Sequence, residues 1–429
     1  MHLITTRPAR GMVAAIGIGA VVILSACAPS PQASSSPSPS PAQTTAAPEP
    51  YAGPVVFVGD ELDAFALSPE EIVGIVPEAA DVGDLSPVLE QVSDGGGAPA
   101  APPICDALYA EQSLGSVGAR TVEWNVPTDP TYGFGRMTIM QFADEAQAAG
   151  RMDQLLQAAE QCAEFTKEGT ASFDAVIPDG SENARAFAGS LVDETPDWRS
   201  FSAFASTGNV IVQLWQPFTG DRTFDAEAAA LLLRERAEEA RSGLIEELTA
   251  NPPVAETDPS GDPGTVWSDW QIGVGGVGPL RLGDSVDSAI AAAGDDVQVV
   301  EPEYDGGPWR LVAPGEAGTI LVRPVEAGDA VWSITVGDDR GLGEDVADGA
   351  ALPSRGDIRL GAPVADAMAA YPGGTVFEVV SSGEHYYAVT TRDGQVFAFH
   401  GDRDVREDGA TIVGITVEDA TARQVPVFG

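Results

Sequence analysis

Basic side chains are scarce in this sequence of 429 residues. Lysine and arginine together number 22 against 65 acidic residues, Lys167 is the one lysine, and the formal net charge is −43. This charge repels nucleic-acid phosphates and anionic lipid surfaces, so we expect the folded part of the chain to bind neither. Hydrophobic residues make up 44% of the sequence, which is enough for packed cores, and the length suits two or three domains.

The common signatures of catalysis are also missing. The sequence has no HExxH, no Walker-type lysine loop and no GxSxG motif. Residues 273–278 match GxGxxG, but Pro279 and a strand-like pattern follow where a dinucleotide-binding loop would open a helix, which indicates a glycine-rich turn. We therefore expect no cofactor and no enzymatic activity. A cell-wall hydrolase remains the alternative, because two of the 65 acidic residues could form a catalytic carboxylate pair.

Residues 1–27 have the pattern of an export signal. Arg7 and Arg10 precede an apolar run at 11–24, whose 14 residues fall short of the roughly 20 that span a membrane. The run ends in Leu24-Ser25-Ala26-Cys27, which resembles the lipobox of bacterial lipoproteins. The resemblance implies lipidation of Cys27 and anchoring to the cell membrane on its extracytoplasmic face. The alternative is an ordinary signal peptide with a chance cysteine.

Two segments of biased composition divide the rest of the chain. Residues 28–50 are rich in proline and serine and predict a disordered, extended stalk. Residues 251–264 are rich in proline, glycine and acidic residues and predict a linker. The predicted domains are therefore residues 51–250 and 265–429.

Two cysteines remain if Cys27 carries lipid. An even number of cysteines outside the cytoplasm favours a disulfide, here between Cys105 and Cys162. The alternative is two independent buried thiols.

Residues 51–250 alternate between strand and helix patterns, which predicts an α+β fold with helices packed on an antiparallel sheet. Ser68, Pro69 and the two acidic residues after them predict a helix start. The other predicted elements are a strand at 135–142, a helix of about 20 residues from Asp144, a hairpin at 198–205 and 210–215, and a helix at 225–248.

The order of these features is similar to the extracellular sensor domain of actinobacterial serine/threonine kinases of the PknH type, which also occurs in stand-alone lipoproteins. The similarity rests on Leu67-Ser68-Pro69-Glu70-Glu71-Ile72, on Pro102-Pro103-Ile104-Cys105, and on the order strand, Phe142, Ala146, helix and Cys162. It covers about residues 60–250 and implies a cleft for a ligand. The second disulfide usual in this family is absent here.

Residues 265–429 contain an internal repeat, with copies at about 272–337 and 353–419. Leu280-Arg281-Leu282-Gly283 matches Ile358-Arg359-Leu360-Gly361, and each copy ends in the triplet Ile-Thr-Val. Each copy predicts a short helix followed by an antiparallel meander, and two copies together bury a shared core. The repeat resembles the tandem modules of β-lactamase-inhibitor proteins and of SmpA/OmlA lipoproteins, which implies a sheet surface for binding a protein or peptide.

His385, His400 and Asp402 are the candidates for a metal site. A two-residue turn at Asp393-Gly394 would pair Tyr387 with His400 and His385 with Asp402, which places both imidazoles on one face. Zinc binding by these three side chains is one interpretation. We expect instead that they are partly exposed rim residues and that no metal is bound.

The sequence as a whole predicts a membrane-anchored, extracytoplasmic lipoprotein that acts as a non-catalytic sensor or binding module. Its expected partner is an extracytoplasmic ligand or an envelope protein of unknown identity. An inhibitor or accessory subunit that acts through the repeat is a further alternative. The seven tryptophans could include platforms for stacking sugars, although core packing explains them equally well.

Overall fold

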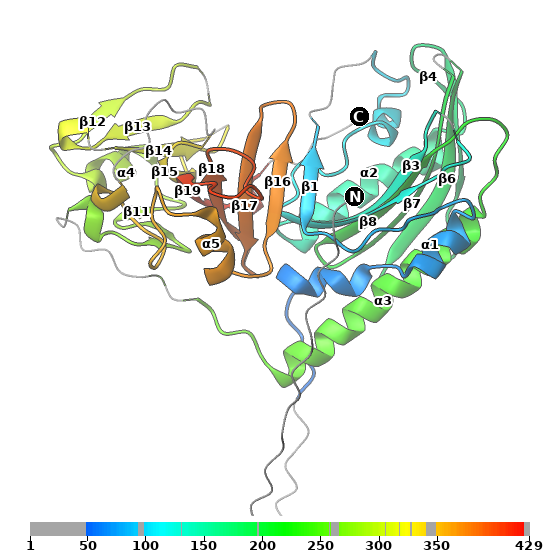
Figure 1. The fold of residues 1–429 in the computed structure, drawn as a ribbon, viewed down its shortest axis with the longest axis horizontal. Coiled ribbons are helices and arrows are strands. Elements are labelled where there is room, and N and C mark those ends of the chain that lie inside the picture. The colour runs from blue at the N-terminus through cyan, green and yellow to red at the C-terminus, as the bar shows by residue number, and fades with distance from the viewer. Residues whose placement is uncertain are drawn as a thin grey trace, which may run out of the picture. The chain divides into compact units, whose positions relative to one another are not determined.

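The computed structural model describes residues 49–92, 98–129, 131–194, 197–256, 258, 266–304, 306–316, 318–326, 328–339 and 349–423. Within these residues the strands form sheets of seven, nine and three strands, called here the first, second and small sheet (Figure 1). The architecture is α+β, as the sequence predicts. Cys27 and the predicted signal and stalk up to residue 48 lie outside the described residues.

The first sheet is antiparallel throughout, in the order β2-β3-β8-β7-β6-β5-β4. Its strands are β2 (Gly118–Asn125), β3 (Phe134–Gln141), β4 (Phe165–Thr166), β5 (Thr170–Val176), β6 (Arg185–Glu194), β7 (Asp197–Thr207) and β8 (Val210–Pro217). The predicted strand at 135–142 and the predicted hairpin are β3 and the pair β7–β8. The hairpin is confirmed by the register, in which Thr207 pairs with Val210.

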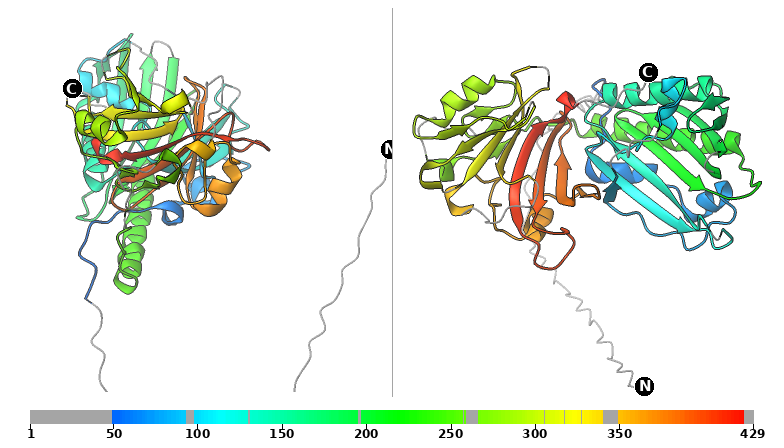
Figure 2. Two further views of the ribbon diagram at one scale, coloured as in Figure 1. Left: turned by 90° about the vertical axis from the view of Figure 1, so that its left-hand side faces the viewer. Right: turned by 90° about the horizontal axis from the view of Figure 1, so that it is seen from above.

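Helices cover both faces of the first sheet (Figures 1 and 2). On one face, apolar side chains of α3 (Ala226–Ala250), α1 (Pro69–Ile75) and the 3₁₀ helix η1 (Gly59–Phe65) form a core with Met137, Ile139 and their neighbours. On the other face, α2 (Glu145–Gln161) and η2 (Pro103–Leu108) form a second core around Met140. The two cores follow from the alternation along β3, because successive side chains of a strand point to opposite faces.

The helix starts follow the predicted caps. The Ser68 hydroxyl accepts a hydrogen bond from the Glu71 amide, and the Glu71 carboxylate accepts one from the Ser68 amide, which forms a capping box. Asp144 caps α2 through the Gln147 amide at 2.8 Å. A disulfide joins Cys105 in η2 to Cys162 at the end of α2.

The second sheet has the order β1-β16-β17-β18-β19-β15-β14-β13-β12, and its strands from β12 onward come from the repeat. They are β12 (Gln298–Val300), β13 (Trp309–Val312), β14 (Thr319–Pro324), β15 (Val331–Gly337), β16 (Thr375–Val379), β17 (Glu384–Thr390), β18 (Gln395–Gly401) and β19 (Ile412–Asp419). The two copies meet where β15 pairs antiparallel with β19. Thr335 faces Thr416 there, and their hydroxyl groups are 2.7 Å apart. The identical triplets thus pair around a local twofold axis.

One face of the second sheet is covered by α4 (Val286–Ala293), α5 (Val364–Ala370) and the small sheet. The small sheet is the meander β9 (Ile272–Gly273), β10 (Gly276–Val277) and β11 (Leu280–Arg281), so the GxGxxG sequence forms turns, as expected. Gly278 has φ +53°, and a Cβ atom there would lie 2.5 Å from the Trp270 ring. The remaining 3₁₀ helices are η3 (Trp267–Asp269), η4 (Pro314–Glu316), η5 (Gly349–Ala351) and η6 (Ala420–Ala422).

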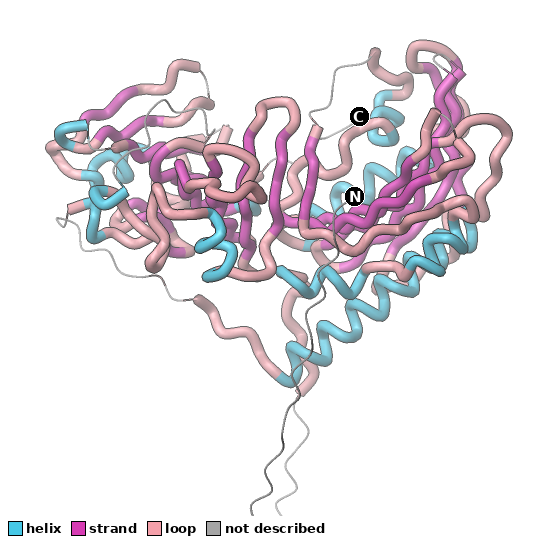
Figure 3. Tube along the Cα trace, in the orientation of Figure 1, coloured by secondary structure: helices cyan, strands magenta, loops and turns pink. Residues whose placement is uncertain are grey.

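Strand β1 (Val88–Gln91) comes from the N-terminal half of the chain but pairs parallel with β16 at the edge of the second sheet. Figure 3 shows β1 between the strands of the first sheet and those of the repeat. Leu89 of β1 packs with Ala119 of β2 and with Phe377 and Ala388 of the repeat. The Thr375 hydroxyl accepts a hydrogen bond from the Ala119 amide at 2.9 Å. The two halves therefore share a packed, hydrogen-bonded boundary.

Long apolar helices are not a feature of the described part of the chain. No helix there combines the length and the hydropathy that crossing a membrane requires.

Candidate functional site

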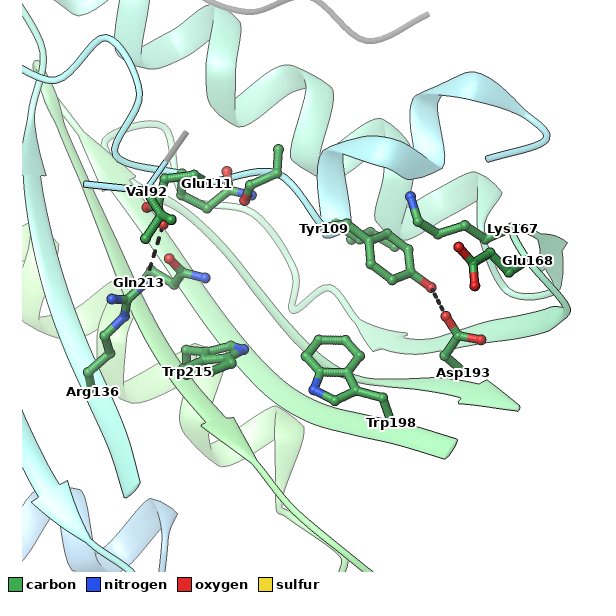
Figure 4. Close-up of a pocket in the computed structure, with 13 residues that line it drawn as sticks. Val92, Tyr109, Glu111, Arg136, Lys167, Glu168, Asp193, Trp198, Gln213 and Trp215 are labelled. Atoms are coloured by element: carbon green, nitrogen blue, oxygen red, sulfur yellow. Dashed lines mark hydrogen bonds and ion pairs between the residues drawn. The ribbon is translucent and has the colours of Figure 1, made fainter. Parts of the chain in front are cut away.

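The first sheet carries a cavity of about 550 Å³ on its α2 side. Along β8, Ile211 lies in the core beneath α2, whereas Gln213 and Trp215, which share its face by alternation, line the cavity. The helix thus covers one part of this sheet face, and the other part forms the cavity floor. Arg136 of β3 and Trp198 of β7 complete the floor (Figure 4).

The strand register fixes how far apart the backbone positions of the two floor tryptophans lie. Trp215 pairs with Arg136 on one side and with Ser202 on the other, whereas Trp198 pairs with Asp193 of β6. Trp198 is four residues from Ser202 along β7, and four residues of strand span about 13 Å. The two half-buried indoles therefore stand at separate positions along an elongated floor (Figure 4).

The wall of the cavity begins at the last residue of η2 and extends over residues 108–112. The Tyr109 hydroxyl donates a hydrogen bond to Asp193 Oδ2 at 3.2 Å, and burial together with that carboxylate raises the pKa of Tyr109. The Lys167 ammonium lies 4.2 Å from the centre of the Tyr109 ring and 2.9 Å from Asp106 Oδ1. The disulfide at Cys105 holds η2 against the end of α2, so it also positions this wall.

The other end of the cavity is organised around Arg136. Its guanidinium lies 5.5 Å from the centre of the Trp215 ring, and its Nη2 is 3.5 Å from Glu111 Oε2. Glu111 Oε1 accepts hydrogen bonds from the Ser113 amide at 3.1 Å and from its hydroxyl at 2.8 Å. Each end of the cavity thus has one basic side chain with an acidic partner.

These groups suit recognition of a polar molecule that has apolar faces. The aromatic rings of Tyr109, Trp198 and Trp215 offer stacking surfaces, while Gln213 and the carboxylates offer hydrogen-bonding groups. Small-molecule sites commonly have volumes of about 300–1,000 Å³ and this mixture of aromatic and polar lining.

The histidine candidates lie on opposite faces of the second sheet, so the predicted register is wrong. Tyr386, not Tyr387, pairs with His400. The connection from Thr391 to Gln395 contains three residues, and its last one, Gly394, has φ +82°. A left-handed glycine in this position extends a hairpin loop by one residue, and a shift of one residue moves a side chain to the other face.

The surroundings of His400 and Asp402 agree with this correction, and His400 is buried rather than partly exposed at the rim as expected. His400 Nε2 is 2.9 Å from the Thr416 hydroxyl, and burial lowers the pKa of His400 to about 4 although Asp338 and Asp339 oppose the shift. Asp402 binds Arg403 and the Thr411 amide rather than pairing with His385. In the described part of the chain, no three histidine, cysteine or acidic side chains form a cluster that could hold a metal ion.

Most of the cavity could not be predicted from the sequence. Lys167 is distinctive as the one lysine, but nothing in the sequence separates Trp198 and Trp215 from Trp124 and Trp270, which are buried in cores. A signal was present in β8, where the face that begins with the buried Ile211 continues with Gln213 and Trp215. Tyr109 and Asp193 reach the cavity through long-range folding and have no comparable signal.

Comparison with known proteins gives little further guidance. No family model matches the sequence, and no curated protein matches it. Among solved structures, the chain is similar to the extracellular domain of PknH from Mycobacterium tuberculosis, at 12% identity and a TM-score of 0.30. The alignment covers 46% of this chain and 99% of that domain. A TM-score at this level does not establish a shared fold.

Proposed function

We propose that the protein is an extracytoplasmic lipoprotein that binds a small molecule in the cavity of the first sheet without converting it. The observation that carries the proposal is the cavity floor, where Trp198 and Trp215 are half-buried on regular strands and face an open cavity of about 550 Å³. Side chains on sheet strands are held more precisely than side chains on loops, which favours a preformed binding site.

The acidic side chains of the cavity support binding rather than hydrolysis. Asp193 accepts the hydrogen bond of Tyr109, and Glu111 is held by Ser113 and Arg136. Glu168 is exposed, whereas the general acid of a glycosidase is normally held in apolar surroundings. Asp193 and Glu111 are thus engaged by protein groups and Glu168 is in solvent, which favours hydrogen bonding to a ligand over glycoside cleavage.

The proposed location has two supports. The Cys105–Cys162 disulfide is typical of proteins outside the cytoplasm. The sequence Leu-Ser-Ala-Cys at residues 24–27 has the form of a lipidation site. A lipid-anchored protein of this kind would present its cavity to molecules of the cell envelope.

The test is a thermal-shift screen of the full chain with Cys27→Ala against a library of envelope metabolites. A ligand of this cavity raises the melting temperature of the parent and of Trp332→Ala, a half-buried tryptophan in β15 that does not line the cavity. The same ligand leaves the melting temperature of the double variant Trp198→Ala/Trp215→Ala unchanged. Hits that persist in the double variant would refute the assignment of the cavity. If the protein converts a hit and Asp193→Asn abolishes the conversion, the cavity is a catalytic site and the proposal of binding without conversion is wrong.

A further inference from the structure

The charges of the cavity argue against an anionic ligand. Arg136 and Lys167 are the basic side chains among the described lining residues, and each has an acidic partner, Glu111 at 3.5 Å and Asp106 at 2.9 Å. Glu168 and Asp193 add further negative charge. Since the whole chain has a net charge of −43, a phosphate or carboxylate ligand would also be repelled at long range.

Two of the three aromatic side chains, Tyr109 and Trp215, argue against a cationic ligand. Aromatic sites for ammonium groups work by placing the cation over a ring face. In this cavity the protein already supplies those cations. Lys167 Nζ lies 4.2 Å from the centre of the Tyr109 ring, and Arg136 Cζ lies 5.5 Å from the centre of the Trp215 ring. A ligand cation would meet two basic groups of the protein at these faces.

A neutral ligand with many hydroxyl groups suits the lining of the cavity. The half-buried indoles of Trp198 and Trp215 line the cavity, Trp215 with Arg136 over one side of its ring, and Asp193, Glu168 and Gln213 offer oxygen acceptors around them (Figure 4). Hydroxyl donors form stronger hydrogen bonds with carboxylates than with neutral acceptors. The backbone positions of the two tryptophans are about 13 Å apart along the sheet, so a ligand with more than one ring can contact both indoles.

From this lining we infer that the cavity binds a neutral oligosaccharide, with sugar rings stacked on Trp198 and Trp215 and hydroxyl groups donating to Asp193, Glu168 and Gln213. The inference rests on the proposed function, because it assigns a ligand class to the same cavity.

The experiment is an NMR titration of the full chain with Cys27→Ala, labelled with ¹⁵N in the tryptophan indoles. The probes are cellotetraose, chitotetraose and maltotetraose as neutral tetrasaccharides, tetramethylammonium as the cation and inorganic phosphate as the anion. We expect at least one tetrasaccharide to shift the indole signals of Trp198 and Trp215, which are assigned from the single variants. Trp198→Ala and Trp215→Ala each weaken its affinity about tenfold, as expected for loss of one stacked ring.

Trp332→Ala is the matched control and leaves the affinity unchanged, while Trp215→Phe restores part of it because a ring remains. Far-UV circular dichroism checks that each variant is folded. If only tetramethylammonium or phosphate shifts the two signals, the oligosaccharide inference is wrong and the cavity remains a binding site. The same conclusion follows if no tetrasaccharide binds but the metabolite screen yields another hit that depends on the cavity. If no probe shifts the indole signals and the metabolite screen yields no hit, both proposals are refuted.

Discussion

Asp129, in the loop between β2 and β3, offers a quantitative test of the structure. Its side chain is 0% exposed, yet it accepts five hydrogen bonds. The donors are the amides of Thr131, Tyr132 and Thr219 at 2.9 Å, and the Thr219 hydroxyl and Arg222 Nη1 at 3.0 Å. Burial alone would raise the pKa of Asp129, but these donors outweigh it and lower the pKa to about 2.

The size and the pH dependence of the contribution follow from this shift. A fall in pKa from 3.8 to about 2 corresponds to about 2 kcal/mol of the free energy of unfolding. Because the folded-state pKa is the lower one, this contribution is fully present above about pH 4 and is lost as the pH falls towards 2. Asp129→Asn removes the charge and turns an amide group towards the donors. We therefore expect a loss of at least about 2 kcal/mol at pH 7.

Urea unfolding followed by circular dichroism, at pH 7 and near pH 2, measures both effects. The difference between wild type and Asp129→Asn should shrink by about 2 kcal/mol at the lower pH. Asp221→Asn is the matched control, since this carboxylate is fully exposed and lies 3.4 Å from Arg199, and its effect should stay within about 0.5 kcal/mol. An equal loss for Asp129→Asn at both pH values would contradict the proposed role of the ionised carboxylate.

Two further predictions concern the cysteines. Cys105 and Cys162 are 57 residues apart, so Cys105→Ser/Cys162→Ser should lower the free energy of unfolding by about 4 kcal/mol in the chain-entropy model. A urea midpoint equal to that of the wild type would show that the disulfide does not stabilise the fold. Cys27→Ala should move the protein from the membrane fraction to the soluble extracytoplasmic fraction, as measured by fractionation and immunoblotting. Unchanged membrane association of this variant would exclude Cys27 as the anchor.

Local features of the fold could be predicted from the sequence because short-range chemistry determines them. Ser68 and Asp144 cap the helices that they were expected to start, and the β7–β8 hairpin forms where its turn residues lie. In each case the partners are a few residues apart. The repeat was also visible, since its two copies share strand patterns and the triplet that pairs at Thr335 and Thr416.

Features that depend on one backbone angle or on distant segments could not be predicted. The sequence Asp-Gly is compatible with hairpin loops of two or three residues. Because Gly394 adopts the left-handed conformation, the loop has three residues, and His385 and His400 lie on opposite faces of the sheet rather than on one. The cavity combines side chains from β3, β6, β7 and β8 with a wall held by a disulfide. Only the tertiary fold shows that Trp198 and Trp215 face the same volume.

Strand β1 has a practical consequence for recombinant work. The proline-rich segment at 251–264 is an obvious place to truncate the chain, but a fragment that starts there keeps β16 without β1. The outer edge of β16 would then be unpaired, and Phe377 would lose the cover of Leu89 and Ala119. Unpaired edges next to apolar surface recruit strands from other molecules. Ligand measurements on an isolated C-terminal fragment would therefore report self-association, and the undivided polypeptide is the appropriate sample.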